Sequence, residues 1–354
     1  MSKTATSGTG ELENIFCLLS GENPTLPQAE VEAILESERH PMEASLKLPR
    51  MLRFRSTLRG AEAIVRRAAY TRLCCREIFS CEAKEDQILD KARTIQFQKF
   101  LNHDETFRVE IVKIEPKASF EEKRIKEKIG QEILDSVSGA RVNLVQSDKT
   151  FVGAVATKSF ILGSVIEGRD SRLSSKKPHS RPFFHPSAMS TKLARCMINL
   201  SRASPGSVFL DAFCGTGSHL IEAALMGCTV LGSDIDPRMV KGTLQNLCFL
   251  ELEKYHLCIA DAKAVPFKSI DSCASDPPYG RGSSTHGGDA LEIMKDFLEN
   301  VFDVIASGSY ICLAFPEYGN IGELGTDIGY KAQGSHFVRE HKSLTREIVV
   351  LRRP

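Results

Sequence analysis

The chain has 354 residues, of which 42% are hydrophobic and 26% are charged. This length corresponds to about two domains, and the composition is that of a folded globular protein, which excludes a disordered or fibrous chain. The 46 Lys and Arg residues nearly balance the 45 Asp and Glu residues and leave a net charge of +1. A polyanionic partner would therefore have to bind at local basic patches.

The eleven cysteines are scattered along the chain, and no two of them have C-x-x-C spacing. We therefore expect neither a zinc site nor a disulfide framework, and we predict no metal. Residues 1–14 are polar and lack the apolar centre of a signal peptide, so a disordered tail is predicted there. No later stretch approaches the roughly 18 apolar residues of a membrane span. These features predict a cytoplasmic protein without membrane association.

Residues 15–167 mix apolar, strand-like runs with amphipathic segments. Strands are predicted at 15–19, 51–56, 76–81, 107–114, 141–145, 151–156 and 159–165. A helix is predicted where Leu26, Val31, Ile34 and Leu35 recur at helical spacing, and further helices at 60–71, 85–100 and 121–137. Several strands are close enough in sequence to form hairpins, so this half is predicted to be α+β, as one or two small units.

Residues 168–195 form a basic stretch in which seven Lys or Arg residues accompany one acid, Asp170. Pro178, Pro182 and Pro186 interrupt regular structure there, so we place an interdomain linker at 168–186. From residue 207 onward, predicted strands alternate with predicted helices; the strands are 208–211, 229–234, 257–261, 272–276 and 309–315, and the helices are 220–226, 238–251 and 291–305. Short apolar strands that end in carboxylates predict an α/β fold with a doubly wound, Rossmann-like parallel sheet.

The first of these strands runs into a glycine-rich loop, Asp211-Ala212-Phe213-Cys214-Gly215-Thr216-Gly217. Its two glycines allow a tight turn and a close approach of the backbone to a ligand. A dinucleotide-binding fingerprint would need a third glycine at position 220, which is leucine. The carboxylate of Asp211 suits instead a ligand that carries an amino group, and S-adenosylmethionine is such a ligand. The alternative is a strand-to-helix turn that binds nothing.

Carboxylates also end the next two strands. Asp234 is predicted to accept hydrogen bonds from both hydroxyls of a ribose. Asp236, directly before Pro237, is better explained as the N-cap of the following helix. Asp261 and the adjacent Ala262 amide follow the third strand, where they would contact the amino edge of an adenine.

The fourth strand ends in Asp276-Pro277-Pro278-Tyr279. The exocyclic amine of a nucleobase is a poor nucleophile, because its lone pair is delocalised into the ring. The Asp276 carboxylate and the Pro277 carbonyl can accept its two N–H groups and aim the lone pair at a methyl group, while the prolines stiffen the loop. Tyr279 offers a ring on which a flipped base stacks. An ordinary turn is the alternative, but the position after three other strand-end acids favours base methylation.

In this order the four segments resemble class I methyltransferases that modify exocyclic amines. Further segments are similar to the archaeal tRNA (guanine-10-N2)-methyltransferases, namely Leu19–Val31, Arg181–Pro186, Pro278–Ser284 and His341–Arg346. One departure is Gly282, which follows Arg281 where that family would have serine. The resemblance implies a ferredoxin-like domain at 15–65, an RNA-binding THUMP domain at 66–167 and a class I methyltransferase domain at 187–354.

The resemblance also implies roles for individual residues. S-adenosylmethionine would be bound by Asp211, Phe213, Cys214, Gly215, Gly217, Asp234, Ile235, Asp261 and Ala262. The catalytic residues would be Asp276, Pro277, Pro278 and Tyr279. Contacts to tRNA would come from Arg169, Arg172, Lys176, Lys177, Arg181, Arg281 and Arg346. A solvated hinge is the alternative for the linker residues, and surface ion pairs are the alternative for Arg281 and Arg346.

The predicted function is transfer of one or two methyl groups from S-adenosylmethionine to N2 of a guanosine in tRNA, at position 10, with a small activating protein as a further partner. An N6-adenine methyltransferase of DNA or another RNA would use the same tetrapeptide, but residues 15–167 show no helix-turn-helix or zinc-finger pattern. A non-catalytic RNA-binding protein would not need Asp211, Asp276 and the glycines together. A nicotinamide dehydrogenase would need the missing third glycine.

Overall fold

The computed structural model describes residues 10–114, 121–156, 158–168, 178–186, 188–278, 290–341 and 344–354. Contacts within the chain divide it into two compact units, each assembled from separate stretches of sequence. The first unit consists of residues 1–21, 40–65 and 71–168. The second unit consists of residues 22–39, 66–70 and 169–354.

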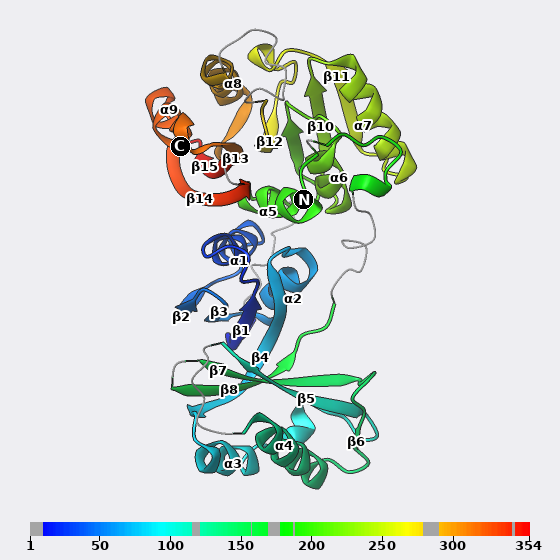
Figure 1. The fold of residues 1–354 in the computed structure, drawn as a ribbon, viewed down its shortest axis with the longest axis vertical. Coiled ribbons are helices and arrows are strands. Elements are labelled where there is room, and N and C mark those ends of the chain that lie inside the picture. Colours follow the sequence, from blue (N-terminus) through cyan, green and yellow to red (C-terminus); the bar gives the residue numbers. More distant parts are fainter. Residues whose placement is uncertain are drawn as a thin grey trace, which may run out of the picture. The chain divides into compact units, whose positions relative to one another are not determined.

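The first unit is built on an eight-stranded sheet with the strand order β2-β3-β1-β4-β8-β7-β5-β6 (Figure 1). Its strands are β1 Glu13–Leu19, β2 Glu43–Leu48, β3 Met51–Ser56, β4 Thr71–Glu82, β5 Thr106–Lys113, β6 Arg141–Val142, β7 Lys149–Ala156 and β8 Ser159–Val165. Its helices are α2 Leu58–Arg67, which ends in the second unit, α3 Glu85–Arg93, the short 3-10 helix Phe97–Lys99 and α4 Glu122–Ser136. This half is α+β as predicted, and its assignment as a ferredoxin-like domain at 15–65 and a THUMP domain at 66–167 stays a prediction.

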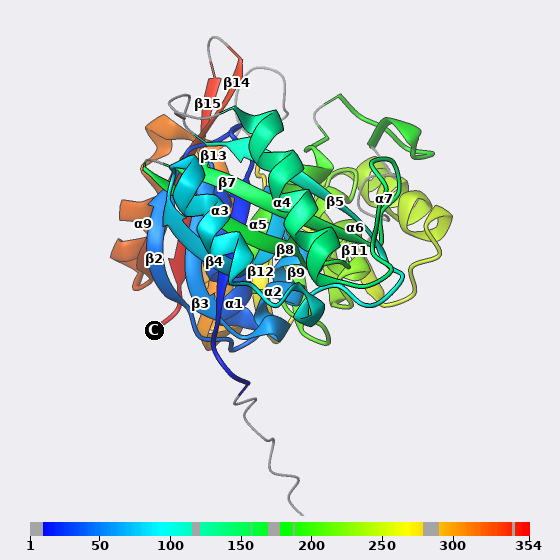
Figure 2. The same cartoon turned by 90° about the horizontal axis from the view of Figure 1, so that it is seen from below.

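The helices α3 and α4 cover one face of this sheet (Figures 1 and 2). Ile125, Ile129 and Ile133 recur at every fourth position of α4, and all three are fully buried. They share a core with Phe107 and Phe151 of the strands β5 and β7. Most residues of α4 are charged or polar, and these residues lie on the side of the helix that is turned away from the sheet.

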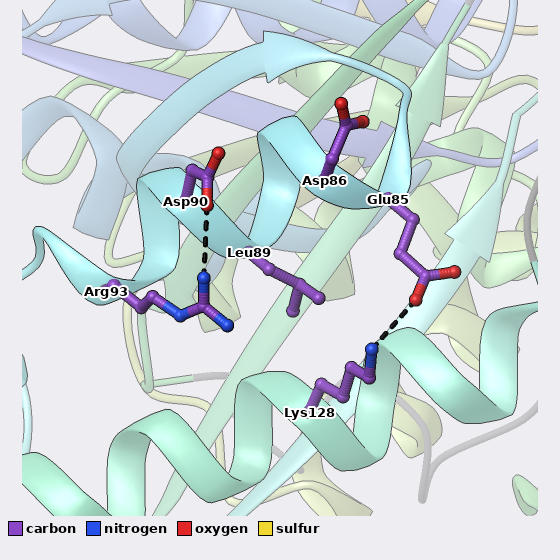
Figure 3. A pocket seen from close by; sticks show the side chains of 6 residues that line it. All are labelled: Glu85, Asp86, Leu89, Asp90, Arg93 and Lys128. Carbon is purple, nitrogen blue, oxygen red and sulfur yellow. Dashed lines mark hydrogen bonds and ion pairs between the residues drawn. The ribbon is translucent and has the colours of Figure 1, made fainter.

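A shallow hollow between α3 and α4 is lined by Glu85, Asp86, Leu89, Asp90, Arg93 and Lys128 (Figure 3). Lys128 donates to Glu85 at 2.9 Å, and Arg93 pairs with Asp90 at 3.1 Å. These charges neutralise one another at the surface instead of converging on a ligand. The candidate site lies in the second unit.

The second unit contains a seven-stranded sheet with the order β11-β10-β9-β12-β13-β15-β14. Its strands are β9 Val208–Asp211, β10 Thr229–Asp234, β11 Tyr255–Ile259, β12 Ile270–Ser275, β13 Ile305–Pro316, β14 Lys331–His341 and β15 Leu344–Arg352. Strands β9 to β13 are parallel, and β15 runs antiparallel between β13 and β14. The predicted parallel sheet is thereby confirmed.

The helices of the second unit are α1 Leu26–Ser37, α5 Thr191–Leu200, α6 Ser218–Leu225, α7 Pro237–Phe249, α8 Ala290–Val304 and α9 Ile321–Ile328. Short 3-10 helices lie at Pro178–Ser180, Ala262–Ala264 and Glu317–Gly319. Within the described ranges, no helix is long and apolar enough to span a membrane.

Helices cover both faces of the second sheet, and successive strand residues point to opposite cores. Phe209 of β9 packs in one core with α5 and α6, whereas the adjacent Leu210 packs in the other core with α8 and α9. Ala274 and Cys273 of β12 divide in the same way. This burial on both faces explains why the strands read as apolar runs instead of alternating patterns.

The N-terminal helix α1 belongs to the second unit, where it packs against α5. Its buried Glu30 accepts hydrogen bonds from the backbone amides of Ala69 and Tyr70 and from the side chain of Asn199, each at 2.8 Å. Arg67 completes this buried network by donating to Asn199 and to the carbonyl of Ala203. Burial raises the pKa of Glu30, while these bonds to its carboxylate oppose the rise.

Apart from the short 3-10 helices, five observed elements have no counterpart among the predicted ones: β2, β14, β15, α5 and α9. Helix α5 is buried throughout Leu193–Leu200, and its polar Arg195 and Asn199 are paired in the interior with Glu222 and Glu30, so its polar residues do not mark a solvent-exposed face. The strands β2 and β14 carry many polar residues at the edges of their sheets. The helix predicted at 85–100 ends instead at Arg93, and the strand predicted at 76–81 extends over Thr71–Glu82.

Substitution of Glu30 by alanine is expected to destabilise the second unit, because three buried donors lose their acceptor. Each unsatisfied donor costs roughly 1–3 kcal/mol. Urea denaturation of the full chain, followed by circular dichroism, measures the loss against Glu62→Ala, which removes an exposed glutamate of α2. Equal midpoints for the two variants would contradict a stabilising role for the Glu30 network.

Candidate cofactor and catalytic site

The predicted site residues gather at the carboxyl ends of the parallel strands in the second unit. Asp211 ends β9, Asp234 ends β10, and Asp276 directly follows β12. The strand order reverses at β9, since the chain goes from β9 outward through β10 to β11 and then returns to β12 on the other side of β9. Open α/β sheets bind their ligands at such a switch point.

The glycine-rich loop between β9 and α6 depends on two left-handed residues. Gly215 has φ +52° and Gly217 has φ +84°. The amides of Cys214, Gly215 and Gly217 are all bonded within the protein, to Ser233, Asp234 and Cys214 respectively. A loop that cradled a pyrophosphate would present its amides to the ligand. The observed bonding therefore fits a ligand without phosphate.

Asp211 lies beneath this loop and is 1% exposed. One carboxylate oxygen accepts from the hydroxyl of Ser275 at 2.7 Å and from the amide of Phe213 at 3.2 Å. The other oxygen is 3.1 Å from the Nδ1 atom of His219 on α6. Asp211 therefore shapes the loop from below, and its predicted contact with the amino group of the cofactor stays a prediction.

Two polar residues of α7 support the loop and were not among the predicted site residues. Thr243 donates to the carbonyl of Gly215 at 2.7 Å, and Asn246 donates to the carbonyl of Thr216 at 2.9 Å. Asn246 also pairs with the backbone of Phe183, which belongs to the segment Arg181–Pro186. The three-residue spacing of Thr243 and Asn246 puts both side chains on one helix face, which is a signal that the sequence does contain.

Both carboxylate oxygens of Asp234 accept hydrogen bonds from backbone amides. One accepts from the amide of Gly215 at 2.9 Å and the other from the amide of Asp236 at 3.0 Å. Burial raises the pKa of Asp234, while these two hydrogen bonds lower it. Asp236 caps α7 by accepting from the amide of Arg238, as its position before Pro237 predicts. The neighbouring Ile235 is 47% exposed, so an apolar side chain is available beside Asp234 for a flat ligand.

Asp261 follows β11 and caps the short helix Ala262–Ala264, where it accepts from the amide of Lys263 at 3.0 Å. Ala262 is buried, and Phe213 and Cys214 lie in the loop between β9 and α6. The residues predicted to contact the cofactor thus follow three adjacent strands, β9, β10 and β11.

Asp276 and Pro277 begin the fourth predicted segment, with Pro277 buried and Asp276 partly buried. The Asp276 carboxylate is 3.5 Å from the guanidinium of Arg346 on β15. Pro278 follows them at partial exposure, and Tyr279 lies outside the described residues.

The predicted tRNA contacts fall into three groups. Arg169, Arg172, Lys176, Lys177 and Arg281 lie outside the described residues. Arg181 is 5% exposed and approaches the Ser218 hydroxyl at the start of α6, and burial lowers its pKa. Arg346 contacts Asp276. A direct contact of any of these residues with RNA stays a prediction.

The donor set of this site fits S-adenosylmethionine. Gly215 leaves open space above the loop, since a Cβ there would meet only the carbonyl oxygen of Phe213, at 3.9 Å. A carboxylate at the end of β10 suits a ribose, and the exposed Ile235 suits an adenine face. When bound, this cofactor would supply a methyl group on a positively charged sulfur.

Substitution of Gly217 by alanine is expected to weaken the affinity for S-adenosylmethionine at least about tenfold. A Cβ at Gly217 would lie 2.9 Å from the methyl carbon of Thr243, and the left-handed backbone adds about 1–2 kcal/mol of strain. Gly206→Ala is the matched control, because Gly206 has φ +87° but open space around it. Titration calorimetry checks both variants, and the additional change Thr243→Ser should restore part of the affinity. Equal losses for Gly217→Ala and Gly206→Ala would refute the assignment.

Comparison with known proteins agrees with this geometry. A family model described as an RMKL-like methyltransferase domain matches residues 178–345. A second model, described as a DNA methylase, matches residues 57–245 and so ends before Asp276. Among solved structures, TrmN from Thermus thermophilus aligns with a TM-score of 0.57 and 16% identity, covering 97% of this chain and all of that one. A putative methyltransferase complexed with SAH aligns with a TM-score of 0.53 and 14% identity, covering 98% and 99% of the two chains.

These structural similarities show the fold, and a sequence relative shows the family. A tRNA (guanine(10)-N2)-dimethyltransferase from Methanothermobacter thermautotrophicus is 34% identical over 96% of this chain and 99% of its own length. The chain therefore belongs to the tRNA (guanine(10)-N2)-dimethyltransferase family, and its second unit is an S-adenosylmethionine-dependent methyltransferase domain.

Proposed function

We propose that this protein transfers methyl groups from S-adenosylmethionine to the exocyclic N2 of guanosine 10 in tRNA. The observation that carries the proposal is the Asp276 carboxylate, which stands at the carboxyl edge of β12, one strand away from the glycine-rich loop after β9. The family relationship supports both the acceptor and the modified atom.

In the proposed reaction, the guanosine leaves its stack and enters the pocket at the strand ends. The Asp276 carboxylate and the Pro277 carbonyl accept the two N–H groups of the amine, which turns the nitrogen lone pair toward the methyl group. The backbone of two consecutive prolines holds these acceptors in place. Catalysis then depends on orientation more than on proton transfer.

Proton removal follows methyl transfer. The methylated nitrogen is far more acidic than the original amine, so Asp276 or water takes its proton after the new bond has formed. A second methylation requires the monomethylated amine to rotate and to offer its remaining N–H group to the same acceptors. We propose that both steps use the same site.

Residues 66–167 are proposed to be the THUMP domain that binds the tRNA, after a ferredoxin-like domain at 15–65. The basic linker residues Arg169, Arg172, Lys176 and Lys177 are proposed to contribute to the same binding. With a net charge of only +1, binding would depend on such local clusters and would weaken steeply with salt. The cytoplasm, where the chain would meet tRNA, is the proposed location.

A labelled methyl group on S-adenosylmethionine tests the reaction. The purified chain is offered unmodified tRNA transcript, the same transcript with guanosine 10 replaced by adenosine, and adenine-rich DNA, and the products are digested to nucleosides. Label in N2-methylguanosine or N2,N2-dimethylguanosine from the first transcript alone is expected. Label in N6-methyladenosine would overturn the proposed acceptor and favour the DNA methylase alternative.

Replacement of Asp276 by alanine is expected to lower the rate of methyl transfer by roughly 10²–10³-fold, because one of the two acceptors for the amine is lost. Affinity for S-adenosylmethionine should stay nearly unchanged, since Asp276 follows β12 and not the strands that carry the cofactor residues. Asp327→Ala, which removes an exposed carboxylate of α9, is the control. Parallel loss of rate and cofactor affinity in Asp276→Ala would contradict the assigned role.

A small activating protein is proposed to bind at the β11 edge of the second sheet. Strand β11 has a single neighbour, β10, among the described strands, so one side of its backbone is open to pairing. Phe249, Leu244 and Ile259, beside or on this strand, are 58%, 41% and 62% exposed. An unpaired edge beside exposed apolar side chains is a suitable surface for a protein partner.

Stimulation of activity tests this partner. Methyl transfer by the recombinant chain is measured alone and with a small-protein fraction from the native host, for the wild type and for Phe249→Asp. We expect the fraction to raise the rate of the wild type, and Phe249→Asp to abolish this increase while it retains the basal rate. Full activity of the wild type alone, with no increase on addition, would refute the need for an activator.

A further inference from the structure

Arg346 reaches the proposed catalytic edge because β15 runs opposite to the parallel strands. In the registers of the sheet, Arg346 stands beside Pro316, the last residue of β13, and beside Val338 of β14. The last residue of β12, Ser275, pairs with Leu313 near the same end of β13. The beginning of β15 and the end of β12 therefore meet at one edge of the sheet.

The side chain of Arg346 lies between two carboxylates. One terminal nitrogen is 3.5 Å from Asp276, and the other donates to Glu340 of β14 at 3.2 Å. The side chains of Arg346 and Asp276 are only 15% and 16% exposed. An arginine so enclosed is poorly placed to contact an RNA backbone, which would require an exposed guanidinium.

We propose that Arg346 is a positioning residue that keeps the Asp276 carboxylate ionised and aimed at the amine of the base. This inference rests on the proposed function, because it assigns Asp276 as an acceptor for that amine. Partial burial disfavours a carboxylate charge, and an adjacent guanidinium favours it. An ionised carboxylate has about four acceptor sites, so contact with one guanidinium is compatible with a hydrogen bond to the substrate.

Glu340 defines the orientation of the guanidinium. A flexible arginine that lacked this second contact would sample several rotamers, and Asp276 would follow it. By holding one end of the planar group from the neighbouring strand, Glu340 directs the other end toward Asp276. The hairpin β14–β15 thus supports the loop that carries Asp276, about 70 residues earlier in the sequence.

The test compares Arg346→Met with Arg346→Lys in the full chain, by measuring kcat, the KM for tRNA and the affinity for S-adenosylmethionine. We expect Arg346→Met to lower kcat roughly 10- to 100-fold, as misplacement of a catalytic group does, with nearly constant KM and cofactor affinity. Arg346→Lys should recover part of kcat, because it restores the charge without the planar fork. Arg339→Met removes an exposed arginine of the same hairpin and serves as the control.

Three results would overturn the proposal. A raised KM with an unchanged kcat would make Arg346 an RNA contact. Equal kcat values for Arg346→Lys and Arg346→Met would show that its charge is irrelevant. An unchanged kcat in both variants would remove any role in the reaction. If Arg346→Met fails to fold, Arg346→Gln takes its place in the same comparison with Arg346→Lys.

The outcome is separable from that of the proposed function. If the wild type methylates a base other than guanine in tRNA, the proposed acceptor fails, and the Arg346 variants are then compared on the base that is methylated. Any exocyclic amine would need the same acceptor at Asp276, so a selective loss of kcat on that base would still support the positioning role.

Discussion

The rest of the site depends on the hydrogen bonds that the buried carboxylate of Asp211 makes. It joins the loop after β9 through the Phe213 amide and α6 through His219 to the end of β12, 64 residues away in the sequence, through Ser275. The cofactor loop and the residue that precedes Asp276 are thereby held by the same oxygen atom. Asp211 is 1% exposed, so water cannot take the place of its hydrogen-bond partners. The relative position of these elements therefore depends on this one carboxylate.

Much of the second unit could be predicted from the sequence because its signals are local. The parallel strands β9 to β12 are short, an acid ends or closely follows each of them, and these acids fall at one edge of the sheet. The N-cap role of Asp236 follows from its proline neighbour in the same local way. Periodicity and strand-end chemistry therefore sufficed for the sheet and for the order of the site residues.

The missing features depend on contacts between distant stretches. Thr243 and Asn246 become site residues only because α7 folds back over the glycine-rich loop. Arg346 meets Asp276 only because an unpredicted antiparallel strand enters the sheet. Arg181, which looks like part of an exposed basic linker, is buried beside α6. The shared helix face of Thr243 and Asn246 can be read from their spacing, but no pattern within a few residues reports which distant element a side chain meets. For that reason composition alone suggested surface roles for both arginines.

The second unit is assembled from stretches on both sides of the first unit in the sequence, and this affects how the chain folds during synthesis. Helix α1 leaves the ribosome early, yet the Asn199 that binds its Glu30 is 169 residues later. At the usual pace of translation this delay is on the order of ten seconds or more. Throughout that time the apolar face of α1 lacks α5, and the carboxylate of Glu30 lacks its contact with Asn199. The first unit can form before the second is complete, and its sequence neighbour α1 must wait for a core that is encoded in the other half of the chain.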